Sequence, residues 1–163
     1  MKRIGLVVNP IAGMGGSVGL KGTDGDSYRK AVELGAQPVT PFRVKEFLSC
    51  LKKHKECVFY AAPGKMGADI LAENGLNFTV VGSIGKETSS EDTNRIVRTM
   101  AESGVDLLVF AGGDGTARDV FDAVGTKIPV IGIPSGVEDL QLSLRPQRQG
   151  GGGHGGCIFG GCL

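Results

Sequence analysis

Five short apolar runs recur along the chain, separated by stretches in which apolar residues have a helical spacing. None of the runs alternates apolar with polar side chains, which is typical of strands that are buried on both faces of a parallel sheet. Parallel strands need crossover connections, which are usually helical and right-handed, so the pattern predicts a doubly wound, mainly parallel, Rossmann-like α/β sheet. The runs are Ile4–Val8, Cys57–Ala62, Phe78–Val81, Val105–Ala111 and Pro129–Ile133.

Helical signals lie between these runs. Thr40 before Pro41 predicts the N-cap and first position of one helix, and Thr88 with Glu91 three residues later predicts the capping box of another. A glycine-rich loop is expected from Ile11 to about Gly25, and a short helix is expected over 65–73. The expected apolar helix faces comprise Val44, Phe47, Leu48, Leu51, Ile96, Val97, Met100, Val120, Phe121 and Val124.

Composition narrows the class of protein. With 18 Lys and Arg against 17 Asp and Glu, the net charge of +1 argues against nucleic acid or an anionic membrane surface as the main partner. No apolar run approaches the roughly 20 residues that a membrane span needs. The first apolar run ends at Asn9-Pro10, too early for a signal peptide, and Cys50 and Cys57 are expected to be reduced core thiols. These features predict a cytoplasmic protein.

The glycine-rich turn after the fourth run carries the chemistry. Gly112-Gly113-Asp114-Gly115-Thr116 leads directly from an expected strand into an expected helix. Glycines there allow backbone N–H groups to approach phosphate oxygens, and a helix N-terminus favours an anion. Thr116 is expected to cap this helix or to donate its hydroxyl to a phosphate.

Asp114 is the unusual member of the turn, because an acid at a phosphate site repels its ligand unless it binds a metal ion or accepts a proton. Phosphoryl transfer requires both functions, since Mg²⁺ neutralises charge and a carboxylate orients the attacking hydroxyl. The alternative is an Asp-Gly pair that only supplies turn geometry.

The combination of motifs resembles the ATP-NAD kinase family, and most closely its bacterial and archaeal polyphosphate/ATP-NAD kinase branch. The resemblance rests on the stretch from Val109 to Thr116 and on the strand Pro129-Val130-Ile131-Gly132-Ile133-Pro134. The strand that ends in Asn9-Pro10 before Gly13, Gly15 and Gly16 also matches, as does Thr88-Ser89-Ser90-Glu91-Asp92-Thr93. It covers about Lys2 to Val137.

The resemblance implies Mg²⁺-dependent phosphorylation of the NAD 2′-hydroxyl to NADP, with ATP or polyphosphate as donor. Asp114 would then be the general base, with Gly112, Gly113, Gly115 and Thr116 around phosphate. Asn9 would contact ribose or phosphate through its amide, or else it would only end the first strand in an Asn-Pro turn. No metal ligands are assigned by the sequence.

Other functions remain open beside this one. The GGDG turn also occurs in diacylglycerol- and sphingosine-type lipid kinases, and a nucleotide-binding module without activity fits the same residues. Whichever kind of kinase the chain belongs to, nucleotides are its expected partners. The sequence is also compatible with a homo-oligomer.

The sequence changes character after residue 137. We expect an α/β domain over 1–137 and an irregular glycine-rich tail over 138–163, in place of the β-rich second domain that the family typically carries. Codons permitted for Leu140 to Pro146 give Tyr-Ser-Ser-Val-Phe-Ala in a shifted reading frame, which is the family's usual continuation. A frameshift near Val137 is therefore one hypothesis, and a naturally short paralogue is the other. Either way, the chain by itself is expected to bind nucleotide and to turn over slowly.

Overall fold

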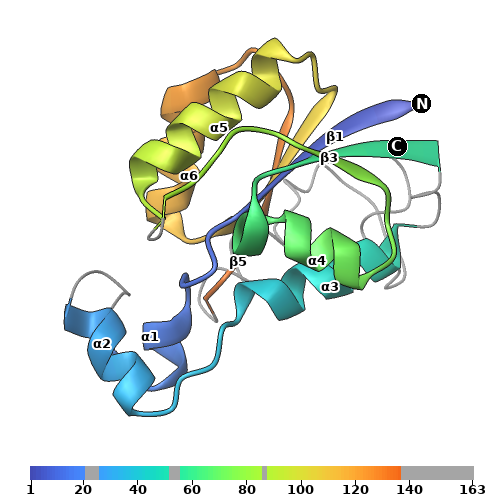
Figure 1. Ribbon diagram of the computed structural model, residues 1–163. Coiled ribbons are helices and arrows are strands. Elements are labelled where there is room, and N and C mark those ends of the chain that lie inside the picture. The colour runs from blue at the N-terminus through green and yellow to red at the C-terminus, as the bar shows by residue number, and fades with distance from the viewer. Residues whose placement is uncertain (21–25, 52–55, 86–87, 137–163) are drawn as a thin grey trace, which may run out of the picture.

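The computed structural model describes residues 1–20, 26–51, 56–85 and 88–136. In this part of the chain, one parallel sheet has the strand order β3-β2-β1-β4-β5 (Figure 1). The predicted doubly wound parallel α/β fold is confirmed, and every expected strand is present. The strands are β1 (Lys2–Val8), β2 (Cys57–Ala61), β3 (Phe78–Val80), β4 (Leu107–Gly112) and β5 (Val130–Pro134).

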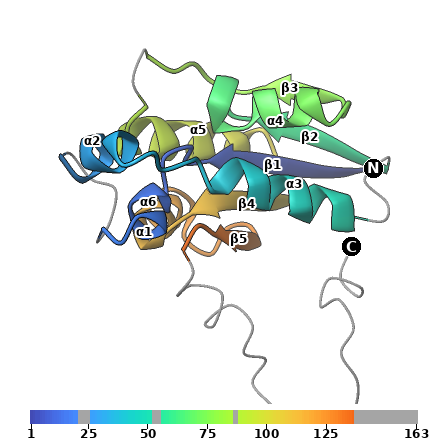
Figure 2. The same cartoon turned by 90° about the horizontal axis from the view of Figure 1, so that it is seen from below.

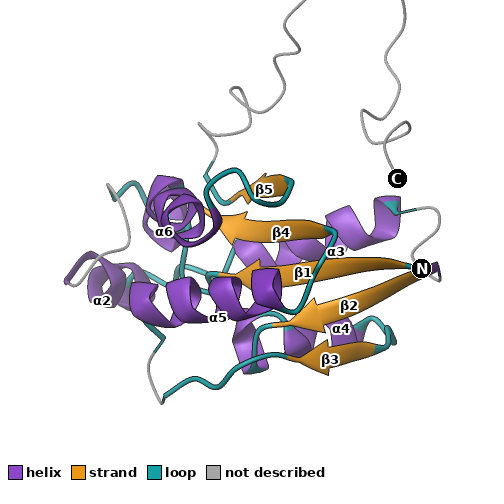
Figure 3. Ribbon diagram, turned by 90° about the horizontal axis from the view of Figure 1, so that it is seen from above, coloured by secondary structure: helices purple, strands orange, loops and turns teal. Residues whose placement is uncertain are grey.

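Helices cover both faces of this sheet. Seen from below, α3 (Thr40–Cys50) and α4 (Ala68–Glu73) lie over the strands (Figure 2). Seen from above, α5 (Ser90–Glu102) and α6 (Asp114–Val124) lie over the opposite face (Figure 3). Successive β-strand side chains point to opposite faces, so the inner strands β1, β2 and β4 contribute to two separate apolar layers, which explains why their buried parts are apolar without alternation. None of the described helices is long and apolar enough to cross a bilayer.

The two layers follow this division. The layer under α3 and α4 contains Ile4, Leu6, Val8, Val44, Phe47, Leu48, Phe59, Ala61, Ile70, Leu71, Val109 and Ile133. The layer under α5 and α6 contains Val7, Met66, Ile96, Val97, Met100, Leu108, Val120 and Val124. The predicted apolar helix faces are therefore the buried ones, with one exception. Phe121 lies on the outside of α6 and is 63% exposed.

The strand order also fixes where a ligand can bind. The chain winds from β1 outward to β2 and β3, then crosses to the other side of β1 to form β4 and β5. The connections diverge between β1 and β4, which pair in parallel from Ile4 with Leu107 to Val8 with Ala111. In open α/β sheets, the crevice at the carboxyl ends of such diverging strands is the usual ligand site.

The segment expected to be a loop contains helical structure. A short helix, α1 (Met14–Ser17), follows β1, and α2 (Asp26–Glu33) comes before α3. These helices form a small apolar cluster of their own around Met14, Ala31 and Ala36. They lie beyond one end of the sheet (Figure 1). The expectation of a loop starting at Ile11 was therefore wrong from residue 14 to residue 17.

Two predicted helix caps are shifted by one residue. Val39 is the N-cap of α3, while the fully buried Thr40 donates its hydroxyl to the Asn9 carbonyl at 2.8 Å. The capping box of α5 uses Ser89 and Asp92 instead of Thr88 and Glu91. At α5, Ser89 forms the reciprocal cap bonds with Asp92. At α3, no side chain caps the helix, because the Thr40 hydroxyl donates to a tertiary acceptor instead.

Two further expectations need correction. The short helix expected over 65–73 is divided into a 3₁₀ turn, Gly64–Met66, and α4, with Gly67 at a positive φ of 155° between them. Cys50 is exposed and is not a core thiol, whereas Cys57 is half-buried. Burial raises the pKa of the Cys57 thiol, with a smaller contribution from the Glu56 charge.

Candidate functional site

Strand β4 delivers the glycine-rich turn to the carboxyl edge of the sheet. Gly112 is the last residue of β4, Gly113 is the N-cap of α6, and Asp114 begins the helix. The first intrahelical bond runs from Ala117 N–H to the Gly113 carbonyl at 3.0 Å. No side chain caps the α6 N-terminus, so the expectation that Thr116 caps this helix was wrong. Within the described residues, the amides of the first turn remain available to an anion.

The glycines of the turn differ in how much space the surrounding protein leaves for a side chain. A Cβ at Gly112 would lie 2.5 Å from the Thr116 Cβ, so packing of the chain alone requires glycine there. At Gly115 a Cβ would meet nothing within 4 Å. Gly113 would make only an ordinary contact, 3.5 Å from the Ser135 hydroxyl. Intramolecular packing in the described part of the chain therefore does not explain the glycine at position 115. Glycine is favoured wherever a ligand must come close to the backbone.

Asn9 connects this turn to the end of β1. Its backbone N–H donates to the Ala111 carbonyl at 2.8 Å, and its side-chain Nδ2 donates to Thr116 Oγ1 at 3.1 Å. Its Oδ1 accepts from the Ile11 N–H at 3.2 Å, which closes an Asx turn after the strand. The amide thus engages the protein at both of its ends, and one N–H of the NH₂ group remains for a ligand.

Thr116 faces inward toward Asn9. It is 5% exposed, and its hydroxyl oxygen accepts the Asn9 bond. This burial places the Thr116 side chain behind the turn, while its backbone belongs to the first turn of α6. A contribution of Thr116 to phosphate binding is therefore easier through its backbone N–H than through its hydroxyl.

Asp114, unlike Thr116, lies on the surface of the turn. It is exposed, and within the described residues its carboxylate has neither a hydrogen-bond partner nor an ion-pair partner. The N-terminal field of α6 stabilises a carboxylate at this position. An unengaged carboxylate beside uncapped amides can accept a proton from a hydroxyl, or it can bind a metal ion that a phosphate also binds.

Two neighbours of the turn were not singled out as site residues by the sequence. Ser135, which follows β5, is 5% exposed, and its N–H donates to the Gly112 carbonyl at 3.3 Å. Gly13, at a φ of 81°, packs its backbone against Ser135, and a Cβ there would lie 2.9 Å from the Ser135 carbonyl carbon. Only the strand order could have indicated this contact, because the ends of β1, β4 and β5 meet at one edge.

The structure thus brings together all six predicted site residues, Asn9, Gly112, Gly113, Asp114, Gly115 and Thr116. It shows no cluster of three or more His, Cys, Asp or Glu side chains that could hold a metal ion within the described ranges. Mg²⁺ commonly uses one or two carboxylates together with substrate phosphates, so the single Asp114 carboxylate fits such a shared site. Residues 138–163, with His154, Cys157 and Cys162, lie outside the described ranges.

Of three comparisons with known proteins, one identifies a family. No curated protein sequence and no solved structure shows significant similarity to the chain. A family model does match, over residues 4–139, which is well over half of the 163 residues, and it describes the ATP-NAD kinase N-terminal domain. The match covers β1 from Ile4 onward, the other four strands in full and the complete Gly112–Thr116 turn. The chain belongs to the ATP-NAD kinase N-terminal domain family.

Proposed function

We propose that this chain is the nucleotide- and phosphate-binding part of an NAD kinase, which phosphorylates the NAD 2′-hydroxyl to NADP with ATP or polyphosphate as donor. Membership of the family supports a kinase in general. The specific donor and acceptor, and Mg²⁺ as the metal ion, are part of the proposal.

One observation carries the proposal. At the switch point of the sheet, an uncapped helix N-terminus, an exposed carboxylate and a glycine without an intramolecular packing role occur within Asp114-Gly115. A helix N-terminus alone suits many anions. The exposed carboxylate in its first turn is a disadvantage for simple anion binding and an advantage for phosphoryl transfer.

Each residue then has a defined role. The backbone amides of Gly113, Gly115 and Thr116 would bind the donor phosphates, and Gly115 would permit their close approach. Asp114 would accept the proton of the attacking hydroxyl, or orient that hydroxyl toward the phosphorus. Asn9 would hold the turn in place and offer its remaining N–H to ribose or phosphate. Mg²⁺, when bound, would neutralise phosphate charge beside Asp114.

Lipid kinase activity is the main alternative, and a nucleotide-binding module without activity is the second. An apolar groove of about 260 Å³ on the α6 side is lined by residues that include Phe110, Phe121 and Val130. This groove lies along the edge strand β5 and the outer face of α6. Because it does not open at the α6 N-terminus, it gives no support for a lipid acceptor at Asp114.

The test is a pair of measurements on purified protein. Isothermal titration of ATP and of NAD, each with and without Mg²⁺, measures binding, and an enzyme-coupled assay measures NADP formation. We expect ATP binding that strengthens with Mg²⁺, together with detectable NADP. Phosphorylation of diacylglycerol in place of NAD would replace the proposed acceptor, and ATP binding without any turnover would support the inactive module.

A further inference from the structure

Ser135 lies where two glycine-containing segments meet at the carboxyl edge of the sheet. Its backbone N–H donates to the Gly112 carbonyl at 3.3 Å. A Cβ at Gly113 would lie 3.5 Å from the Ser135 hydroxyl oxygen, and a Cβ at Gly13 would lie 3.1 Å from the Ser135 Cβ. Gly113 is the N-cap of α6 and directly precedes Asp114. The Ser135 side chain is therefore held against the N-terminus of α6.

The Ser135 hydroxyl has no intramolecular role in the described part of the chain. The residue is 5% exposed, and its hydroxyl forms no hydrogen bond with another described residue. Its contact with the end of β4 uses the backbone N–H alone. Among the described residues, every fully buried side-chain nitrogen or oxygen has a partner, so this unpaired hydroxyl keeps some contact with solvent. Its removal would cost the folded protein no hydrogen bond, and its capacity to donate is left for a ligand.

The surroundings of this hydroxyl favour an anion. No side chain caps the α6 N-terminus, so the amides of its first turn are donors that no described side chain uses. These N–H groups and the positive end of the helix dipole attract a phosphate and disfavour a bare cation. A serine hydroxyl can add one more donor to such a set. The N-terminus of α6 and the unpaired hydroxyl beside it thus point independently to the same kind of ligand.

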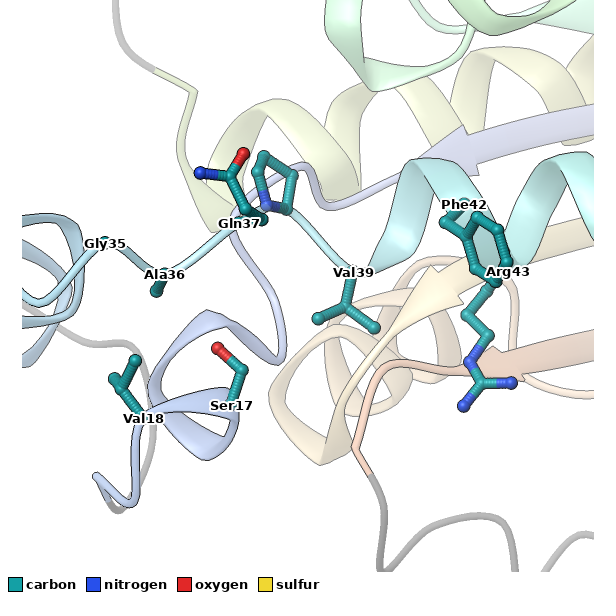
Figure 4. Close-up of a pocket in the computed structure, with 9 residues that line it drawn as sticks. Ser17, Val18, Gly35, Ala36, Gln37, Val39, Phe42 and Arg43 are labelled. Atoms are coloured by element: carbon teal, nitrogen blue, oxygen red, sulfur yellow. The ribbon is translucent and has the colours of Figure 1, made fainter.

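A larger hollow of the surface, about 470 Å³ in volume, is separate from these donors. It lies between the end of α1 and the first turn of α3, and its lining includes Ser17, Val39 and Arg43 (Figure 4). Neither Ser135 nor any residue of the Gly112–Thr116 turn lines it. The Arg43 guanidinium in this hollow is nevertheless a competing phosphate ligand, because guanidinium groups bind phosphate well. It therefore belongs in the test.

We propose that Ser135 is a phosphate ligand of the candidate site, and that its hydroxyl donates a hydrogen bond to an oxygen of the phosphate bound by the amides at the α6 N-terminus. The proposal rests on the kinase function proposed above and adds to it a residue from outside the glycine-rich turn. The ligand class is a polyphosphate, either inorganic or carried by a nucleoside, since the hydroxyl contacts only the phosphate oxygen that both share. Ser135 makes and breaks no covalent bond and serves to hold the phosphate beside Asp114.

The test starts from Ser135→Ala, which removes the hydroxyl and keeps the Cβ. Inorganic tripolyphosphate and ATP are titrated separately against the full chain by calorimetry, with and without Mg²⁺. Both affinities should fall by roughly ten- to a hundredfold, the usual contribution of a hydrogen bond to a charged group. Tm in the absence of ligand should not fall, because no intramolecular bond is lost. A residue with a purely structural role would show the reverse pattern.

Two further variants calibrate this result. Ser135→Cys places a weaker donor at the same position, so its affinity should lie between those of the wild type and Ser135→Ala. Ser49→Ala is the matched control, because the Ser49 hydroxyl donates to the Glu46 carbonyl at 2.7 Å within α3. It should bind both polyphosphates like the wild type.

Three results would overturn the proposal. Unchanged affinities in Ser135→Ala would remove the hydroxyl from the site, and a Tm that falls together with the affinity would make its role structural. A loss of affinity that occurs only with Mg²⁺ would make the hydroxyl a ligand of the metal ion instead.

Two other variants separate this failure from failure of the proposed function. If Gly115→Ala weakens tripolyphosphate binding and Ser135→Ala does not, the phosphate turn stands and Ser135 takes no part in it. If only Arg43→Gln weakens binding, the phosphates occupy the hollow of Figure 4, and both the proposed function and the role of Ser135 lose their phosphate site.

Discussion

The Asn9 side-chain amide donates a 3.1 Å hydrogen bond to the Thr116 hydroxyl oxygen across 107 residues of sequence. This bond joins the end of β1 to the first turn of α6 at the point where the sheet changes direction. The Asn9 carbonyl also accepts from Thr40 at the start of α3. Asn9 therefore ties together a strand and two helices on opposite faces of the sheet, and the position of the phosphate turn depends on it.

The first prediction concerns this bond. Thr116→Val keeps the shape of a β-branched side chain and removes the acceptor, so Asn9 Nδ2 is left partly buried without its partner. We expect the free energy of unfolding to fall by about 1–3 kcal/mol, the usual cost of such a loss. Thr116→Ser keeps the hydroxyl and should lose less. Urea denaturation measures both, and a valine variant as stable as the serine variant would contradict the role of the bond.

The second prediction compares two glycines of one turn. Gly112→Ala places a Cβ 2.5 Å from the Thr116 Cβ, and such overpacking should cost about 1–3 kcal/mol of stability. Gly115→Ala has open space and a helical backbone, so its stability should stay within about 1 kcal/mol of the wild type or rise.

At position 115 we expect the substitution to weaken nucleotide binding although it does not lower stability. If donor phosphates approach the backbone there, the methyl group of Gly115→Ala lies in their path, and ATP affinity falls in a fully stable protein. Thermal melting and ATP titration of the two variants check this pair. Unchanged ATP affinity in Gly115→Ala would show that the phosphates bind elsewhere.

The third prediction concerns the pH dependence of stability. The pKa of Asp92 is held below its usual range, chiefly by the hydrogen bond from Arg95 and next by the Ser89 N–H in the capping box of α5. A carboxyl whose pKa is lower in the folded state stabilises the protein above its unfolded pKa of about 3.9. That contribution is lost as the pH falls through the folded value.

Asp92→Asn should accordingly lower Tm at pH 7, and the difference from the wild type should shrink below about pH 4. Glu91→Gln is the control, because Glu91 is exposed in the same first turn and takes no part in the capping box. Thermal melting from pH 7 down to pH 3 measures all three proteins. A Tm difference that is constant over this range would show that Asp92 acts through packing alone.

The fold could be predicted because its signals are local and repeated. Each buried strand is a short apolar run, and each crossover helix shows an apolar face, so the layers follow from periodicity. The start of α5 was misplaced by one residue because Thr88, Ser89 and Ser90 are all suitable caps. Only the reciprocal bonds between Ser89 and Asp92 distinguish them.

Which residues lie together at the glycine-rich turn could be predicted from the sequence, whereas the contacts among them could not. The turn, Asn9 and Asp114 follow from motifs, and the structure brings them together. That Thr116 faces Asn9 instead of capping α6, and that Thr40 bonds Asn9 instead of capping α3, depends on contacts between residues distant in sequence. The same holds for Gly13 against Ser135. Local pattern contains no information on such contacts.

The last prediction concerns Asp114. It applies to a form of the protein in which conversion of NAD to NADP can be measured. Asp114→Asn keeps the size of the side chain and removes its capacity to accept a proton. If Asp114 is the general base, kcat should fall by roughly 10²- to 10⁴-fold, the usual range for loss of acid–base catalysis. ATP affinity should change little, because the amides of the α6 N-terminus are backbone groups and remain in place.

Asp122→Asn is the control, since Asp122 is exposed on the same helix at a distance from its N-terminus. It changes the charge of α6 by the same amount, so any general electrostatic effect appears in both variants. Turnover of Asp114→Asn near the wild-type rate would remove Asp114 from catalysis. A fall in ATP affinity that accounts for the whole loss of activity would instead assign the carboxylate to metal and phosphate binding. Separate measurement of kcat and of the ATP dissociation constant therefore decides between the two functions that the exposed carboxylate can perform.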